Sequence, residues 1–197
     1  MAEVESLKAP NKPAKLSHTP SPPNYLLWAT GGVMGFLLVG LLILWQSGYF
    51  NLPGQAVRIL GRDHFEPGKL PNYNSNPPTS GLHYADKLAA WGVHYGPTEE
   101  MMQVANLEKG GVILSYRPKG NPVLPDAVRD QLEILVRRLR GESRYCKLLL
   151  ARSATLDKKI ALTAWGRIDK LDAYDEARIL RFINAYINKG PEDVPCL

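Results

Sequence analysis

The longest apolar stretch of the chain covers residues 26–45, LLWATGGVMGFLLVGLLILW, which carries no charged residue. At about 1.5 Å per residue, a helix of this length spans a hydrocarbon core of about 30 Å. Trp28 and Trp45 lie near its ends, where interfacial aromatic anchors are expected. The pattern predicts a transmembrane helix over residues 25–47. A cleaved signal peptide is disfavoured, because the run is long and no Ala-x-Ala cleavage pattern follows it.

The hydrophobic pattern of the second half predicts a small α+β domain. An apolar, β-branched run over residues 110–118 predicts a buried strand, and residues 126–141 carry apolar side chains at helical spacing. Residues 145–153 and 160–168 predict two further strands, which we expect to form a hairpin. A last helix is predicted over residues 172–190. The expected fold is α+β, with helices packed on a small mixed sheet, preceded by one transmembrane helix and a long irregular loop region.

Basic residues lie on one side of the predicted span. Lys8, Lys12 and Lys15 precede it, and the first basic residue after it is Arg58. The positive-inside rule therefore predicts a disordered cytoplasmic tail over residues 1–24 and a C-terminal part that is periplasmic or extracellular. The protein is expected in the inner or plasma membrane as a single-pass protein.

Proline and glycine divide the remaining chain. Residues 48–70 predict a linker with short extended segments, among them a possible short strand at 57–60. Residues 71–197 predict the extracytoplasmic domain. Its opening segment, 71–109, is expected to be an irregular loop that lies across the sheet.

Charge and cysteine content exclude some classes of function. The chain has 24 Lys and Arg against 19 Asp and Glu, and no basic run is dense enough for a nucleic-acid partner. Cys146 and Cys196 do not make a disulfide framework, and whether they pair stays open.

The loop-rich half holds the candidate site residues. His64, His83 and His94 offer imidazoles suited to zinc or copper, although only tertiary folding could bring them together. Loop histidines that only stack or hydrogen-bond are the alternative. Ser80 lacks a nucleophile elbow and no paired carboxylates stand out, so no catalytic residue is assigned and no cofactor other than a possible metal ion is expected.

Several phrases taken together resemble a known family. GRDHFEPG, YNSNPPTSGLHY, WGVHY, NLEKGGVILSYRP, IALTAWGR and FINAYINKGPE occur in this order over residues 61–192. They resemble an uncharacterised bacterial family of single-anchor membrane proteins, catalogued only as a domain of unknown function. The resemblance implies a recurrent fold and supplies no activity.

The resemblance also implies a set of histidines. Family members carry histidines at the positions of His64 and His83, and two more at positions that are here Ala105 and Lys109. A metal centre built on this set would lack two ligands, leaving His64 and His83 with Glu108. Lys109 would then place an ammonium where the metal's charge had been.

The expected function is a non-catalytic binding or structural role, as an accessory or assembly subunit of a bacterial membrane complex. The expected partners are the lipid bilayer and other membrane subunits. A periplasmic zinc- or copper-binding protein, or a metal-dependent enzyme using the loop histidines, is the alternative. In the loop, His83 is expected to point towards Glu108 and Lys109, while aromatic residues hold the loop on the sheet. The residues expected to contact partners are Gly31 and Gly35 in the apolar helix, and Ser80, His83, Tyr84, Trp91, Tyr95, Glu108 and Lys109 in the loop region.

Overall fold

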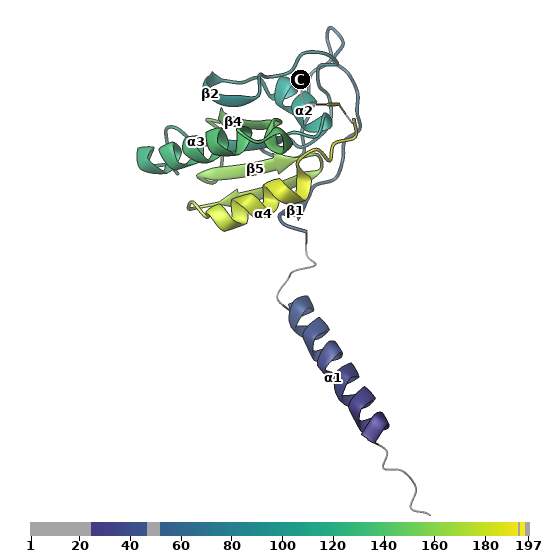
Figure 1. The fold of residues 1–197 in the computed structure, drawn as a ribbon. Coiled ribbons are helices and arrows are strands. Elements are labelled where there is room, and N and C mark those ends of the chain that lie inside the picture. Colours follow the sequence, from purple (N-terminus) through teal and green to yellow (C-terminus); the bar gives the residue numbers. More distant parts are fainter. Residues whose placement is uncertain (1–24, 47–51, 193, 196–197) are drawn as a thin grey trace, which may run out of the picture. The chain divides into compact units, whose positions relative to one another are not determined.

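The computed structural model describes residues 25–46, 52–192 and 194–195 (Figure 1). The chain divides into two compact units, Met1–Asn51 and Leu52–Leu197. The predicted tail over residues 1–24 lies outside the described residues. From Leu52 onward the segment that the sequence assigns to a linker is grouped with the C-terminal unit.

The described residues of the N-terminal unit form helix α1 (Tyr25–Gln46), at the place where the sequence predicts a helix. Its side chains are described over residues 32–43. The large apolar side chains in this stretch are exposed, and Phe36 is 86% exposed. Across the part of the chain that the structure describes, no helix is both long enough and apolar enough to cross a membrane, so the predicted transmembrane span is not supported there.

The C-terminal unit is an α+β domain built on one mixed sheet, which confirms the predicted fold class. Two parallel pairings, β2 with β4 and β4 with β3, make one half of the sheet. Antiparallel pairings of β3 with β5, β5 with β6 and β6 with β1 make the other half. The strand order is β1-β6-β5-β3-β4-β2. The strands are β1 (Gln55–Ala56), β2 (Gly92–Pro97), β3 (Val112–Tyr116), β4 (Leu148–Arg152), β5 (Ile160–Ala164) and β6 (Arg167–Leu171).

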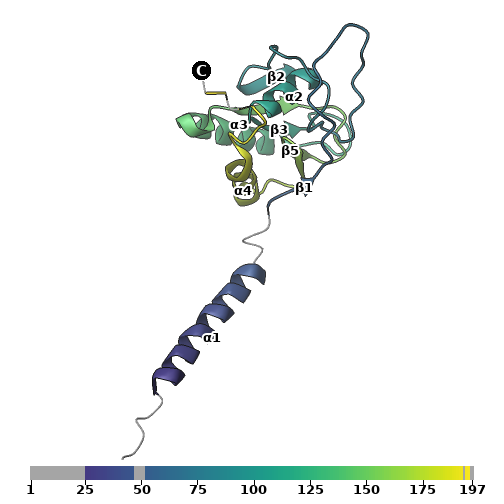
Figure 2. The same cartoon turned by 90° about the vertical axis from the view of Figure 1, so that its right-hand side faces the viewer.

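Helices cover both faces of the sheet. α3 (Asp126–Arg140) and α4 (Glu176–Tyr186) lie together on one face, and α2 (Glu100–Glu108) lies on the other (Figures 1 and 2). A short 3-10 helix, Ser143–Tyr145, follows α3. The Asp175 carboxylate caps α4 by accepting a hydrogen bond of 2.9 Å from the backbone N–H of Arg178, as an N-cap aspartate does.

Two hydrophobic clusters fix these layers. Leu114 and Leu150 pack with residues of α3 and α4, whereas their neighbours Ile113 and Leu149 pack with Leu107 of α2. Side chains alternate between the faces of a strand, so the unbroken apolar runs of β3 and β4 supply both clusters. Each such side chain, when fully buried, stabilises the fold by about 1.5–3 kcal/mol.

The predicted hairpin between the second and third strands is wrong. β3 lies between β4 and β5, because the chain after β4 crosses over and returns antiparallel to β3. The hairpin joins β5 to β6 instead, through Trp165 and Gly166, and Gly166 has a φ of 66°. The apolar phrase IALTAWGRI runs through this turn and therefore resembles one strand.

The segment over residues 71–109 is also more regular than predicted, because it contains β2 and α2. Helix α2 shows no apolar stripe, since Gln103, Asn106 and Glu108 are buried beside Val104 and Leu107. A helix is recognised in a sequence when apolar residues lie on one face and polar residues on the other, and the sequence of α2 has no such division. The short strand expected at 57–60 does not form there, and the strand nearby is β1, at Gln55–Ala56.

Cys146, two residues before β4, is disulfide-bonded. The chain contains one other cysteine, Cys196, which lies outside the described residues. A bonded cysteine bears on the compartment, because disulfides persist in oxidising surroundings.

Candidate functional site

Two loops that are distant in sequence are joined beside the sheet. An isolated parallel bridge pairs His64 with His83. The backbone N–H of Phe65 donates to the carbonyl of His83 at 2.7 Å, and that of His83 donates to the carbonyl of Asp63 at 3.1 Å. The buried Ser80 hydroxyl accepts a hydrogen bond of 3.1 Å from the N–H of Leu60. These backbone contacts bring the two imidazoles together.

Helix α2 supplies the carboxylate of the site. Its Asn106 side chain binds both backbone groups of Ala89 at 2.9 Å, which ties the loop after His83 to the helix. Glu108, the last residue of α2, is fully buried. A buried carboxylate must be paired or hydrogen-bonded. Both oxygens of the Glu108 carboxylate have a hydrogen-bond partner.

His83 connects the loop to that carboxylate. Its Nδ1 lies 2.7 Å from the carbonyl oxygen of Gly81, and its Nε2 lies 2.7 Å from Oε2 of Glu108. A carbonyl oxygen can only accept, so Nδ1 carries a proton and donates it. One further proton must therefore lie between Nε2 and Oε2. The sequence-based expectation that His83 points towards Glu108 is confirmed.

A chain of ion pairs extends from Glu108 to the C-terminal segment. Arg62 donates through Nε to Oε1 of Glu108 at 2.7 Å and through a terminal nitrogen to Glu192 at 3.2 Å. Lys109 donates to the other oxygen of Glu192 at 2.6 Å. The hydrogen bond from Lys109 lowers the pKa of Glu192, and the charges of Lys109 and Arg62 act in the same direction. The hydrogen bond from Arg62 to Glu108 raises the pKa of Arg62.

His64 completes the cluster from the solvent side. Its ring meets that of His83 edge to face, with centroids 5.1 Å apart. His64 is exposed while His83 and Glu108 are buried, and ligand atoms of the three residues all lie within 4.8 Å of one another. Two imidazoles and one carboxylate form a donor set that zinc accepts.

The other predicted site residues lie elsewhere. His94 is on β2, where its Nε2 bonds the carbonyl of Ala90 at 2.6 Å, and the structure does not place it in the histidine cluster. Lys109 reaches Glu192 and not the carboxylate of Glu108, which Arg62 contacts instead. An ammonium of Lys109 at the position of a metal ion is therefore not what the structure contains. Ala105 is fully buried.

The residues predicted to contact partners are only partly accessible. Ser80, His83 and Glu108 are buried, so they offer no contact surface in this conformation. Tyr95 is 54% exposed, and its hydroxyl donates to Glu133 at 3.1 Å. The Tyr84 hydroxyl donates to Glu99 at 2.6 Å, and Trp91 packs against the hydrophobic cluster beneath α2. In the apolar helix, a Cβ on Gly35 would meet nothing within 4 Å. The side-chain surroundings of Gly31 lie outside the described residues.

Three residues of the site are not predicted from the sequence: Arg62, Glu192 and Trp165. The ring centroid of Trp165 lies 6.1 Å from that of His83. Arg62 and Glu192 belong to the phrases GRDHFEPG and FINAYINKGPE. Their charges were the available signal, but nothing in a single sequence pairs residues that are so far apart in it.

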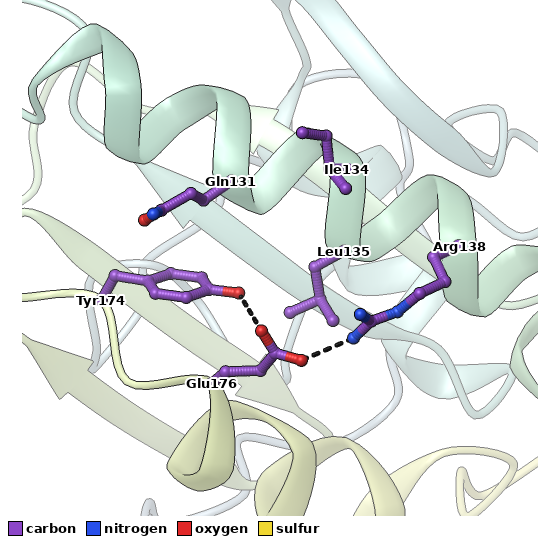
Figure 3. Close-up of a pocket in the computed structure, with 6 residues that line it drawn as sticks. All are labelled: Gln131, Ile134, Leu135, Arg138, Tyr174 and Glu176. Carbon is purple, nitrogen blue, oxygen red and sulfur yellow. Dashed lines mark hydrogen bonds and ion pairs between the residues drawn. The ribbon is translucent and has the colours of Figure 1, made fainter.

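A second surface feature is the pocket between α3 and the start of α4 (Figure 3), and its charges are already neutralised. Glu176 accepts from the Tyr174 hydroxyl at 2.9 Å with one oxygen and from Arg138 at 2.5 Å with the other. Burial, and then the hydrogen bond to Glu176, raises the pKa of Tyr174 to about 12. The remaining lining residues are Gln131, Ile134 and Leu135. This pocket presents no group prepared for acid–base work.

Comparisons with known proteins give a family and no activity. A search of curated proteins and a search of solved structures each found no match. A family model does match, over residues 64–196, a range that contains His64, His83, Glu108 and Glu192. The match covers more than half of the chain, and the chain therefore belongs to the family described as "Protein of unknown function (DUF3105)".

Proposed function

We propose that this protein binds one divalent transition-metal ion, zinc or copper, through His64, His83 and Glu108. The observation that carries the proposal is the pair of hydrogen bonds made by His83. Its Nδ1 proton is committed to the carbonyl of Gly81, so Nε2 faces Glu108 with only a proton between them. A metal ion can take the place of that proton, because it binds the lone pair of Nε2 and the carboxylate together.

The surroundings of the cluster favour a metal ion. A metal-bound histidine usually donates its other N–H to a carbonyl or carboxylate, as His83 does to Gly81. A ligating carboxylate is in turn hydrogen-bonded, as Glu108 is by Arg62. On zinc, Nε2 and Oε2 would move from 2.7 Å to about 3.3 Å apart, the separation of two ligands on a tetrahedral ion. Imidazole ligands select zinc or copper over magnesium or calcium.

The ligand set also limits the proposal. Three protein ligands leave a coordination position for water or another molecule, and the exposed side of His64 is where that position would open. The alanine and lysine at positions 105 and 109 supply no imidazole. We therefore expect an affinity below that of a four-ligand structural zinc site, and we assign no reaction.

The metal proposal predicts a loss of zinc affinity when His64 is replaced. His64→Ala should weaken zinc binding at least about tenfold, because it removes a ligand while leaving the buried pair in place. His64 is exposed, so the variant should keep the thermal stability of the wild type. The measurement is equilibrium dialysis of the tag-free full chain in detergent against zinc and copper, with a chelator competitor.

His94→Ala is the matched control, since it removes a histidine outside the cluster and should bind zinc as the wild type does. A wild-type chain that takes up no stoichiometric zinc or copper would contradict the proposal. So would equal losses in both variants. In either case the cluster would be an ion pair that only stabilises the fold.

For the cellular location we propose a single-pass membrane protein with its C-terminal domain outside the cytoplasm. The support comes from the sequence: the uncharged run over residues 26–45 and the lysines that precede it. The bonded state of Cys146 fits an oxidising compartment. Accessory function within a membrane complex is the second candidate, favoured by the exposed apolar side chains of α1 and the open space at Gly35.

Membrane extraction tests both statements. The protein should stay with membranes in alkaline carbonate and dissolve in mild detergent, because an uncharged sequence of 20 residues is long enough to remain in the bilayer. An accessory subunit should then co-purify with a stoichiometric set of membrane proteins. Release by carbonate would contradict the anchor, and a partner-free monomer at native levels would contradict the subunit role.

A further inference from the structure

A second polar pocket lies away from the histidine cluster, at the end of the parallel strand pair. β3 and β4 run parallel and end in register at Tyr116 and Arg152. In α/β sheets, ligands commonly bind beyond the carboxyl ends of such strands. The pocket there has a volume of about 200 Å³ and is lined by Tyr116, Pro118, Lys119, Leu124, Asp126, Arg129 and Arg152. None of the three proposed metal ligands belongs to this lining.

The lining is cationic, with three basic side chains against one carboxylate. Arg129 shares its charge with Asp126 and Asp130, at 2.8 Å from each. Arg152 is half-buried, and its hydrogen bond is to the Tyr116 hydroxyl at 3.0 Å. Among the described residues, neither Arg152 nor Lys119 has an acidic partner within ion-pair distance. A half-buried guanidinium without a carboxylate is costly unless something else neutralises it.

Tyr116 gives a second, independent indication of a ligand. The residue is 1% exposed, and its hydroxyl oxygen accepts the hydrogen bond from Arg152. Its own O–H proton therefore remains to be donated, and no acceptor for it occurs among the described residues. Buried hydroxyl donors normally have an acceptor. A buried donor and an unneutralised guanidinium in one pocket indicate an anionic acceptor.

We propose that this pocket binds a small oxyanion, a carboxylate or a phosphate. Arg152 and Lys119 supply its charge recognition, and the Tyr116 hydroxyl donates one hydrogen bond. The guanidinium can hold two oxygens of a planar or tetrahedral anion at once. The volume suits a small molecule and not a protein segment. The proposal does not depend on metal binding at the histidine cluster, because the two sites share no residue.

The test compares two arginines that make the same contact in different places. Arg152→Gln should weaken binding of the anion at least about tenfold, the value of one charge-assisted hydrogen bond. Arg137→Gln is the matched control, because Arg137 also bonds a tyrosine hydroxyl, that of Tyr95 at 2.6 Å, but lies outside the pocket. Each variant removes one positive charge, so a loss of non-specific electrostatic attraction for the anion would be the same in both.

Inorganic phosphate and citrate serve as separate probes, and calorimetry on the full chain in detergent gives each Kd. Preference for one probe assigns the class of anion. Lys119→Gln, at an exposed position, provides a second variant if Arg152→Gln unfolds, and it should weaken binding several-fold. Equal losses in the Arg152 and Arg137 variants would overturn the proposal. So would a wild type that shows no saturable binding below about 10 mM of either probe.

Discussion

Replacing Glu108 by alanine is expected to lower the free energy of unfolding by about 3–5 kcal/mol, the usual cost of breaking a buried, hydrogen-bonded charge pair. The variant leaves Nε2 of His83 without its partner, and both the ring and the former carboxylate position are buried. It also releases Arg62, which links Glu108 to Glu192. Denaturant unfolding at neutral pH, in the absence of added metal, measures the loss.

Glu108→Gln separates hydrogen bonding from charge. A glutamine amide oxygen can accept from Arg62, and its NH2 group can donate to the lone pair of His83 Nε2, so every hydrogen bond at the position can be kept. We expect a loss of about 1 kcal/mol for this variant. It should nevertheless lose zinc affinity, because a neutral amide is a poor zinc ligand. A folded protein that no longer binds zinc would assign Glu108 to the metal and not only to the fold.

Glu100→Gln is the control on the same helix. Glu100 is exposed in the first turn of α2, and its replacement should change stability by less than about 0.5 kcal/mol. If Glu108→Ala were as mild as Glu100→Gln, the carboxylate would not stabilise the joined loops. An equally large loss in Glu108→Gln and Glu108→Ala would instead show that the charge, and not the hydrogen bonding, is required.

The elements that the sequence predicts well are those whose side-chain pattern has one clear period. Helix α3 begins at Asp126 and ends at Arg140, matching the prediction, because one face is apolar and the other is charged. β3 lies inside its predicted range because its apolar run ends at a proline. Helix α2 has no such face, since its polar residues are buried in contacts that only the tertiary fold creates.

Strand pairing was harder to predict than strand position. β4 and β5 are consecutive in the chain, and consecutive strands usually pair, which is why a hairpin was expected. Here β4 pairs on both sides with parallel strands, β2 and β3, so β5 must add beyond β3. The turn between β5 and β6 is not recognisable in the sequence, because Trp165 is an apolar residue at a position where turns usually have a polar one.

The sequence predicts the histidines and the carboxylate of the candidate site, but it does not predict the charged residues that pair with Glu108. His64 and His83 stand out as residue types, and the resemblance to a histidine-containing family pointed to Glu108 as their neighbour. Arg62 lies 46 positions from Glu108 in the chain and 130 positions from Glu192. These contacts form because the C-terminal segment packs against the end of α2 in the folded chain. No local sequence pattern predicts that packing.

That packing involves Gly190. The backbone N–H of Asn188 donates to the carbonyl of Gly110 at 2.8 Å, and that of Glu192 donates to the carbonyl of Glu108 at 3.0 Å. Between these two bonds, Gly190 lies against the backbone of the α2 end. A Cβ on Gly190 would lie 2.2 Å from the carbonyl oxygen of Glu108 and 2.2 Å from the nitrogen of Gly110. Both atoms are backbone, so no side chain can rotate away to make room.

Gly190→Ala is therefore expected to lower stability by about 1–3 kcal/mol, the cost of overpacking a filled site. In a chain of this size each kcal/mol corresponds to a fall in Tm of about 2–4 °C. Gly96→Ala is the matched control, because a Cβ there would meet nothing within 4 Å, and it should leave Tm unchanged. Displacement of the segment should also separate Glu192 from Lys109 and Arg62, which makes the C-terminus more sensitive to proteolysis. A Gly190→Ala protein with wild-type Tm and wild-type protease resistance would mean that the segment does not lie against α2 in solution. The ion pairs that join it to Glu108 would then have to be reassigned.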